Sequence, residues 1–218
     1  MTNIKRRAPV LFMTMGIPSL AGITAYRVLT HPWPPHWLTL GLVGLYFGWL
    51  LAEARITLRE PKNEEAQHDR SSLELYFAAR CVTVLATVLS PPWHGKSSIR
   101  WVLVAAGVTI MVVGVGFRLA TIRQLAGTYS HRVRIPFNGI IGGGMYRYLR
   151  HPAYAGMVLG NLGFVVAFAS PIGMAALFGL LLPAVAYRIL VEESLLLSTV
   201  QAYREFAKTR KRLLPFIW

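Results

Sequence analysis

The sequence predicts an all-α, polytopic integral membrane protein that forms one domain. Of its 218 residues, 54% are hydrophobic and only 15% are charged, whereas a soluble domain carries about 25% charged residues. Several apolar stretches have roughly the 20 residues that a helix needs to cross a bilayer. No segment between them has the composition of a flexible linker, so residues 1–218 are predicted to form a single membrane domain.

We expect about six transmembrane helices, or five if one apolar stretch does not cross the membrane. The expected spans are residues 9–29, 37–52, 73–89, 99–120, 152–169 and 172–191. Clustered prolines at residues 32–35 separate the first span from the second, because proline interrupts a helix. A polar, glycine-rich connection over residues 123–150 precedes the fifth span.

Two further patterns concern the helices themselves. Gly44 and Gly48, and likewise Gly156 and Gly160, have the spacing of small residues that predicts close helix packing in membranes. After the sixth span, residues 192–212 predict an amphipathic helix, because apolar residues recur there at helical spacing and four basic residues close the segment. Such a helix is expected to lie on the membrane surface rather than to cross it.

The net charge of +14 is distributed beside the apolar stretches, which argues against a nucleic-acid-binding face. Cytosolic segments of membrane proteins are rich in Lys and Arg. With the N-terminus in the cytosol, only Arg27, Lys96 and Arg100 fall toward the outside, while Glu53 and Arg118 belong to cytosolic connecting segments. We therefore expect a protein of the cytoplasmic membrane with both termini and its functional site facing the cytosol.

Two classes of site are not expected. The six histidines and the single cysteine, Cys81, lack the spacing of a metal site. A nucleotide-binding glycine loop follows a strand and opens a helix, whereas Gly114 and Gly116 lie inside an apolar stretch. The remaining candidates are ionisable groups beside the expected spans.

Residues 75–191 contain no Asp or Glu, and this gap ends at Glu192 and Glu193 beside the sixth span. Ionisable groups at such a place are costly unless they are paired or functional. Arg188 lies four residues before Glu192, so the two side chains share one helix face. They indicate either a functional pair or an arginine that extends to the interface and forms a salt bridge there.

A second candidate region is the glycine-rich, basic turn from Gly142 to Tyr154. Pro152 suits the first turn of a helix, where its missing N–H group costs nothing. The positive end of that helix, with Arg150 and His151 beside it, is suited to a carboxylate or phosphate. The alternative is a basic turn with interfacial tyrosines, which is common at membrane surfaces.

The order of these elements resembles the isoprenylcysteine carboxyl methyltransferase family, which is related to phospholipid N-methyltransferases. The family has the signature G-x-Y…R-H-P-x-Y-x-G, then R-x-x-x-E-E, Y-x-x-Y and a closing L-P-F. The matching elements here are Gly144 to Tyr146, Arg150 to Gly156, Arg188 to Glu193, Tyr203 to Phe206 and Leu214 to Phe216. The resemblance covers residues 117–218, whereas residues 1–116 show only membrane spans.

This resemblance implies a methyltransferase that uses S-adenosyl-L-methionine (SAM) and releases S-adenosyl-L-homocysteine (SAH). Its substrate would be lipidic or prenylated, such as the carboxylate of an isoprenylcysteine, and residues 117–218 would form the SAM-binding catalytic region. Arg188 is assigned to the substrate and, with Glu192, to catalysis. The residues assigned to the cofactor are His131, Asn138, Gly139, Ile140, Ile141, Tyr146, Arg150, His151, Pro152, Ala153, Tyr154 and Glu192. Asn138 departs from the family pattern, which has histidine there.

Three alternatives remain open. A phospholipid or other amine N-methyltransferase would share the cofactor, and Glu192 or Glu193 would then accept the amine proton. A membrane NADPH-dependent reductase of the sterol-reductase type has a similar arrangement of C-terminal helices, but the sequence has no basic pocket clearly committed to a 2′-phosphate. The last alternative is a non-enzymatic membrane scaffold. The expected partners are the lipidic substrate and membrane lipids, without nucleic acid.

Overall fold

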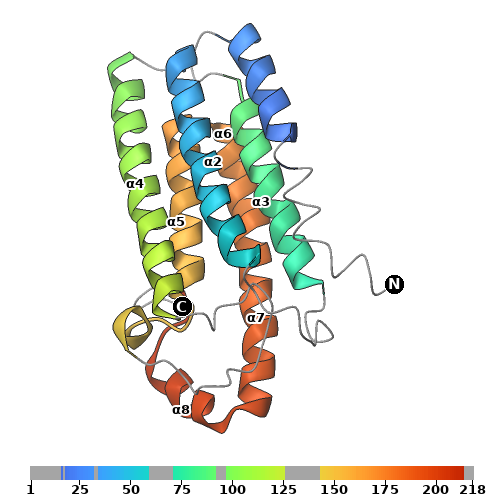
Figure 1. Ribbon diagram of the computed structural model, residues 1–218, viewed down its shortest axis with the longest axis vertical. Helices are drawn as coiled ribbons and strands as arrows, with labels where there is room; N and C mark the ends of the chain where they lie inside the picture. The colour runs from blue at the N-terminus through green and yellow to red at the C-terminus, as the bar shows by residue number, and fades with distance from the viewer. Residues whose placement is uncertain are drawn as a thin grey trace.

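The computed structural model describes residue 16 and residues 18–31, 34–58, 71–91, 97–125 and 143–213. Within these ranges the long elements are helices that run side by side as one bundle (Figure 1). Besides a helix over residues 18–30, they are α2 (His36–Leu58), α3 (Ser72–Leu89), α4 (Ser97–Gln124), α5 (Pro152–Ala167), α6 (Pro171–Ala176), the π-helical η3 (Leu177–Leu181), α7 (Leu182–Thr199) and α8 (Gln201–Thr209). The all-α prediction is confirmed.

Four helices in the described ranges are long and apolar enough to cross a membrane. They are His36–Arg55, Ser72–Leu89, Ser98–Gln124 and Pro171–Thr199, and the apolar α5 is shorter, at 16 residues. Large hydrophobic side chains are exposed on the outside of the bundle, among them Leu40, Leu45, Val102, Val112 and Phe178. Water penalises such a surface and lipid does not. The protein is therefore a polytopic α-helical membrane protein, as predicted.

The last long helix differs from the prediction. α6, η3 and α7 form one helix from Pro171 to Thr199, whereas the sequence predicted a span over residues 172–191 and a separate helix over residues 192–212. Three consecutive leucines, residues 195–197, continue α7 beyond its two glutamates. It ends where Val200 adopts an extended backbone with φ −116° and ψ 100°. Only α8 forms a separate amphipathic helix.

α4 and α5 approach each other so closely that glycine is required at their contact. A Cβ atom on Gly114 would lie 2.4 Å from the backbone nitrogen of Gly160, and one on Gly156 would lie 2.7 Å from that of Arg118. The predicted close packing at Gly156 and Gly160 is therefore confirmed. The prediction for Gly44 and Gly48 is wrong within the described part of the chain, because nothing lies within 4 Å of a Cβ placed at either position.

Candidate active site

The turn before α5 is built on Gly144, whose backbone has a positive φ of 54°. Its short helix η2 covers Gly144–Arg147, and a Cβ atom on Gly144 would lie 2.4 Å from Nε2 of Gln124. Gln124 ends α4, donates to the Gly143 carbonyl at 2.6 Å and accepts from the N–H group of Met145 at 3.2 Å. The positive φ favours glycine here, and the two hydrogen bonds of Gln124 connect the end of α4 to the start of the turn.

The segment after α8 returns to this turn. The N–H group of Arg150 donates to the carbonyl of Lys211 at 2.8 Å, and that of His151 donates to the carbonyl of Arg212 at 3.0 Å. Pro152 occupies the first turn of α5, as predicted. Figure 1 shows α8 and the start of α5 at the same end of the bundle. The basic residues 210–212 therefore lie beside the start of α5.

Glu193 is surrounded by cationic groups and is only 2% exposed. Its Oε1 accepts from Nη1 of Arg150 at 2.8 Å and lies 3.3 Å from Nε2 of His151. Its Oε2 accepts from Nε of Arg212 at 2.7 Å. A buried carboxylate persists only where such partners satisfy it. Glu193 therefore connects α7 to the start of α5 and to the segment after α8.

Glu192 has a different environment, since 26% of its side chain is exposed. Its Oε2 accepts a hydrogen bond from the hydroxyl of Tyr154 at 3.0 Å, and the same hydroxyl accepts from Nε of Arg188 at 3.2 Å. Nδ1 of His151 lies 3.9 Å from Oε1 of Glu192. The predicted pair of Arg188 and Glu192 is thus connected through a tyrosine from α5.

Arg188 is 1% exposed, so the alternative of an arginine that extends to the membrane surface is wrong. Its Nη1 donates to Oγ of Ser72 in α3 at 2.8 Å. The ring of Tyr76, one turn further along α3, meets the ring of Tyr154 edge to face at 6.4 Å. The Tyr76 hydroxyl is buried and has no hydrogen-bond partner among the described residues. The N-terminal half of the chain therefore contributes to a site that the sequence assigned to residues 117–218.

Tyr203 of α8 lies buried beside the two glutamates. Burial, and then the negative charges of Glu193 and Glu192, raise the pKa of the Tyr203 phenol. The phenol therefore stays protonated at neutral pH. Tyr146 packs against the apolar cluster that contains Tyr203 and Leu196, so η2, α7 and α8 meet at aromatic side chains.

A second ionic network lies next to the site, inside the bundle. Glu53 of α2 pairs with Arg80 of α3 at 2.6 Å and with Arg118 of α4. Nη1 of Arg118 also donates to the carbonyl of Ala153 at 2.9 Å, in the first turn of α5. The sequence assigned Glu53 and Arg118 to cytosolic connecting segments, but both are buried within helices. Burial is tolerated because each charge has an opposite charge beside it.

The predicted site residues within the described ranges are Tyr146, Arg150, His151, Pro152, Ala153, Tyr154, Arg188 and Glu192. Of these, Arg150, His151, Tyr154, Arg188 and Glu192 are joined by contacts with one another or with Glu193. Tyr146 packs on the cluster of Tyr203, and Pro152 and Ala153 lie in the chain between His151 and Tyr154. The other predicted residues, His131, Asn138, Gly139, Ile140 and Ile141, lie outside the described residues. Sequence reasoning missed Ser72, Tyr76 and Arg212. The one available signal for Arg212 was that Glu193 needs cationic partners.

The arrangement offers three chemically distinct groups, in which the Tyr154 hydroxyl is hydrogen-bonded to both Arg188 and Glu192. Arg188 is a buried guanidinium that favours an anion, and Glu192 is a partly exposed carboxylate that favours a cation or a hydroxyl donor. The Tyr154 hydroxyl fixes their separation. Within the described ranges, no group of three His, Cys, Asp or Glu side chains is placed to hold a metal ion. The opposite charges of Arg188 and Glu192 are suited to orienting charged ligands.

Known proteins resemble this chain over the segment that contains most of these site residues. Residues 106–198 match the "Isoprenylcysteine carboxyl methyltransferase (ICMT) family". Protein-S-isoprenylcysteine O-methyltransferase A of Arabidopsis thaliana is 29% identical over 123 residues, which cover 54% of this chain and 62% of that protein. A probable protein-S-isoprenylcysteine O-methyltransferase of Oryza sativa subsp. indica is 27% identical over 121 residues, 54% of this chain and 63% of that protein. The chain thus matches less than two thirds of the length of these two relatives.

Proposed function

We propose that the protein is an integral membrane methyltransferase that depends on SAM, because residues 106–198 match the isoprenylcysteine carboxyl methyltransferase family. The family resemblance drawn from the sequence is confirmed. The proposed substrate is the carboxylate of an isoprenylcysteine-like or other lipidic molecule, in keeping with the names of the relatives. The observation that supports an active site is the connection of Arg188 to Glu192 through Tyr154.

The residues present fit SAM as cofactor. Glu192 offers a partly exposed carboxylate, and the buried hydroxyl of Tyr76 has no hydrogen-bond partner among the described residues. Such a hydroxyl is costly unless a ligand satisfies it. When bound, SAM supplies a methyl group on a positively charged sulfur. The described residues that would hold it are Tyr146, Arg150, His151, Pro152, Ala153, Tyr154 and Glu192.

Arg188 would orient the acceptor. A guanidinium binds a carboxylate through two parallel hydrogen bonds, and a hydrogen bond is stronger in a site from which water is excluded. Arg188 is 1% exposed. Methyl transfer to a carboxylate is an in-line displacement that releases no proton, so the site needs alignment and exclusion of water rather than a strong base. The hydrogen bonds of Tyr154 would fix the positions of the Arg188 and Glu192 side chains relative to each other.

An amine acceptor is the second candidate, because Glu192 could accept the proton that such a substrate releases. An amine that is methylated loses a proton, and Glu192 is a partly exposed carboxylate in the site. The names of the relatives favour the carboxylate. The same names support a methyltransferase over the NADPH-dependent reductase and the scaffold.

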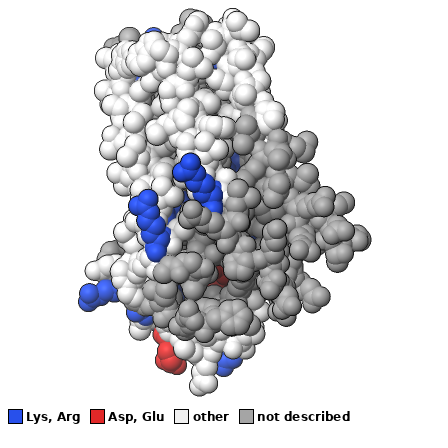
Figure 2. All heavy atoms as spheres, in the orientation of Figure 1, with Lys and Arg blue, Asp and Glu red and all other residues white. Residues whose placement is uncertain are grey.

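We also propose that the site faces the cytosol at the cytoplasmic membrane. On the face shown in Figure 2, Lys and Arg side chains lie mainly in the half of the described surface that contains α8, and few lie in the opposite half. Cytosolic segments carry such an excess of positive charge. A reporter that is active only in the cytosol, fused to Trp218, is expected to be active. Activity only from a reporter that requires export would contradict this orientation.

Ligand binding and turnover test the proposed function together. Purified protein is titrated calorimetrically with SAH and, separately, with NADPH, and is then assayed for methyl transfer to a prenylated cysteine, a long-chain carboxylate and an amine phospholipid. We expect SAH to bind, NADPH not to bind, and a carboxylate to be methylated. Methylation of the amine alone would favour the second candidate. Binding of NADPH without SAH would overturn both.

A further inference from the structure

Three donors share the carboxylate of Glu53 deep in the bundle. It accepts from Nη1 of Arg80 at 2.6 Å, from Nε1 of Trp49 at 2.7 Å and from Nε of Arg118. Glu53 is 2% exposed, so two guanidinium groups divide its charge in surroundings of low dielectric. The positive charge of Arg80 is therefore only partly balanced by this carboxylate.

Arg80 keeps one donor that its contacts do not use. Its Nε donates to the Tyr46 hydroxyl at 2.9 Å, its Nη1 binds Glu53, and its guanidinium carbon lies 4.2 Å from the centre of the Trp49 ring. The remaining nitrogen, Nη2, is buried and has no hydrogen-bond partner among the described residues, and Arg80 as a whole is 3% exposed. A buried cationic donor without an acceptor is costly, so this atom indicates a ligand.

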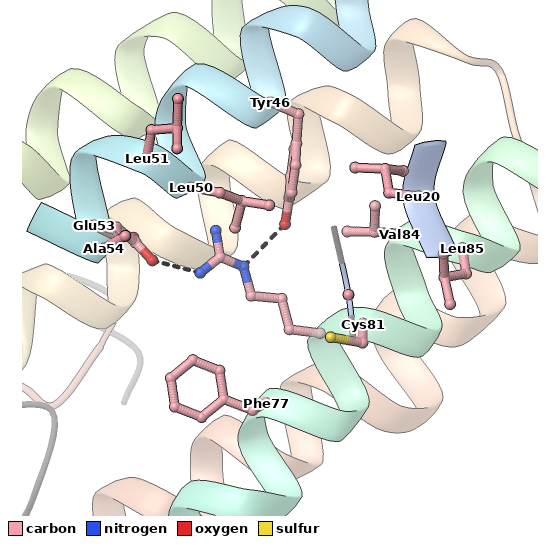
Figure 3. A pocket seen from close by; sticks show the side chains of 12 residues that line it. Leu20, Tyr46, Leu50, Leu51, Glu53, Ala54, Phe77, Cys81, Val84 and Leu85 are labelled. Carbon is pink, nitrogen blue, oxygen red and sulfur yellow. Dashed lines mark hydrogen bonds and ion pairs between the residues drawn. The ribbon is translucent and has the colours of Figure 1, made fainter. Parts of the chain in front are cut away.

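The unpaired donor belongs to a residue that lines a pocket. Figure 3 shows this pocket between residues near the start of the described chain, such as Leu20, and the helices α2 and α3. Its volume is about 70 Å³, several times the roughly 10–15 Å³ that one water molecule needs. Most of the wall is apolar, with Val84 and Leu85 among its residues. Leu51 of the wall is 44% exposed, so the pocket reaches the lipid-facing surface of the described bundle.

We propose that this pocket binds a long-chain carboxylate from the bilayer. The carboxylate accepts a hydrogen bond from Nη2 of Arg80, and the chain leaves past Leu51 into the lipid. A carboxylate suits this donor because it also supplies the negative charge that the guanidinium favours, and charge-assisted hydrogen bonds are about twice as strong as neutral ones. The apolar wall and the hydrocarbon interior of the membrane then form one continuous environment for the chain.

This binding site is distinct from the candidate active site. The residues that line the pocket come from the first 85 residues of the chain, outside the segment 106–198 that matches the family. The active site is organised instead around Arg188 and Glu192 at the end of α7. The proposal that a carboxylate binds at Arg80 therefore does not rest on the proposed methyltransferase activity, and it can be tested without cofactor and without turnover.

Cys81 lines the pocket and is the single cysteine of the chain, so its thiol reports occupancy of this place alone. The experiment follows modification of Cys81 by methyl methanethiosulfonate, measured as intact mass, in full-length protein in a neutral detergent. Oleate, methyl oleate and acetate are added as competitors. We expect oleate to protect the thiol at a concentration at least tenfold lower than methyl oleate requires, and acetate not to protect it.

Variants test the role of Arg80 directly. Arg80→Lys keeps a positive charge but removes the guanidinium, and it is expected to raise the protecting oleate concentration to that of methyl oleate. Arg27→Lys is the matched control, because Arg27 is also a buried arginine but donates to the carbonyls of Val88 and Ser90. If Arg80→Lys does not fold, the comparison of the two oleyl compounds on the unmodified protein decides. Equal protection by oleate and methyl oleate, protection by acetate, no protection, or unchanged behaviour of Arg80→Lys would each overturn the proposal.

Discussion

Arg188 and Glu192 are connected by the hydroxyl of Tyr154, which accepts from Nε of the arginine at 3.2 Å and donates to Oε2 of the glutamate at 3.0 Å. The arginine is 1% exposed, whereas 26% of the glutamate side chain is exposed. One hydroxyl therefore joins the buried end of the candidate site to its open end. This connection leads to predictions for each of the three residues.

Tyr154→Phe removes the hydroxyl and keeps the aromatic ring that packs against Tyr76. Without the hydroxyl, Arg188 and Glu192 lose their common partner and their orientation becomes less defined. We expect turnover to fall about tenfold or more, which corresponds to roughly 1.4 kcal/mol, with little change in thermal unfolding. Tyr148→Phe is the control, because Tyr148 is 67% exposed. Equal turnover in the two variants would contradict the role of the hydroxyl.

The neighbouring glutamates are expected to respond differently to the same change. Glu193→Gln removes the charge that balances Arg150 and Arg212, and a broken buried pair costs about 3 kcal/mol. We therefore expect Tm to fall by at least about 5 °C. Glu192→Gln should keep its Tm and weaken SAH binding at least about tenfold. Differential scanning calorimetry measures the Tm, and titration calorimetry measures SAH affinity. If Glu192→Gln lowered the Tm and Glu193→Gln weakened SAH binding instead, the roles of the two glutamates would be exchanged.

The sequence predicted those features of the fold and the site that depend on the pattern of residues within one segment. Hydrophobic stretches located most of the helices, Pro152 marked the start of α5, and the spacing of Arg188 and Glu192 placed both on one helix face. These features depend on helix geometry within one segment. The end of α7 was misplaced because two adjacent glutamates were taken as the end of the span, whereas tertiary partners allow Glu193 to be buried inside the helix.

What the sequence did not predict depends on helices that meet only in the folded chain. Ser72 of α3 contacts Arg188 across 116 positions, and Glu53 contacts Arg118 across 65. No periodicity within a segment encodes such pairs. The isolated Arg80 within a span was a signal that a buried acidic partner is needed, but nothing local identified Glu53 as that partner.

The close packing of α4 on α5 can be tested by comparing two glycines of α4, one at the contact and one away from it. A Cβ atom at Gly114 would lie 2.4 Å from the backbone of Gly160, whereas nothing lies within 4 Å of one at Gly116. We expect Gly114→Ala to lower Tm by at least about 5 °C, because the helices must separate. Gly116→Ala should leave Tm unchanged or raise it slightly. Similar Tm values for the two variants would contradict the close approach.

Because Glu53 is the shared ionic partner of two buried arginines, we expect its substitution to lower stability strongly. Glu53→Gln leaves Arg80 and Arg118 without their carboxylate inside the bundle, which should cost about 3 kcal/mol. The control is Glu205→Gln, since the side chain of Glu205 is 72% exposed and pairs with Lys208 on the surface, where such pairs contribute little. Thermal unfolding in the same detergent compares them. An unchanged Tm for Glu53→Gln would mean that the network is not structural.

Arg188→Lys tests whether Arg188 acts on the methyl acceptor or on the cofactor. Lysine keeps the positive charge but cannot form the two parallel hydrogen bonds of a guanidinium, so the two residues are not interchangeable at a carboxylate site. In this protein the guanidinium also contacts Ser72 and Tyr154, and a lysine would not hold both contacts in the same geometry. We expect a large fall in turnover with SAH affinity nearly unchanged, and a larger fall for Arg188→Ala.

The contact with Ser72 supplies the control for this prediction. Ser72→Ala removes one hydrogen-bond partner of Nη1 and keeps the guanidinium, so it should lower turnover less than Arg188→Lys does, while SAH affinity again stays the same. Paired calorimetry with SAH and methyl transfer to lipidic carboxylates and amines measure the two effects separately. If Arg188→Ala abolishes SAH binding and Glu192→Ala does not, the assigned roles are exchanged. If Arg188→Ala transfers methyl groups at the normal rate, the residue serves the fold alone, because its buried contacts then stabilise α3 against α7 without acting on a substrate.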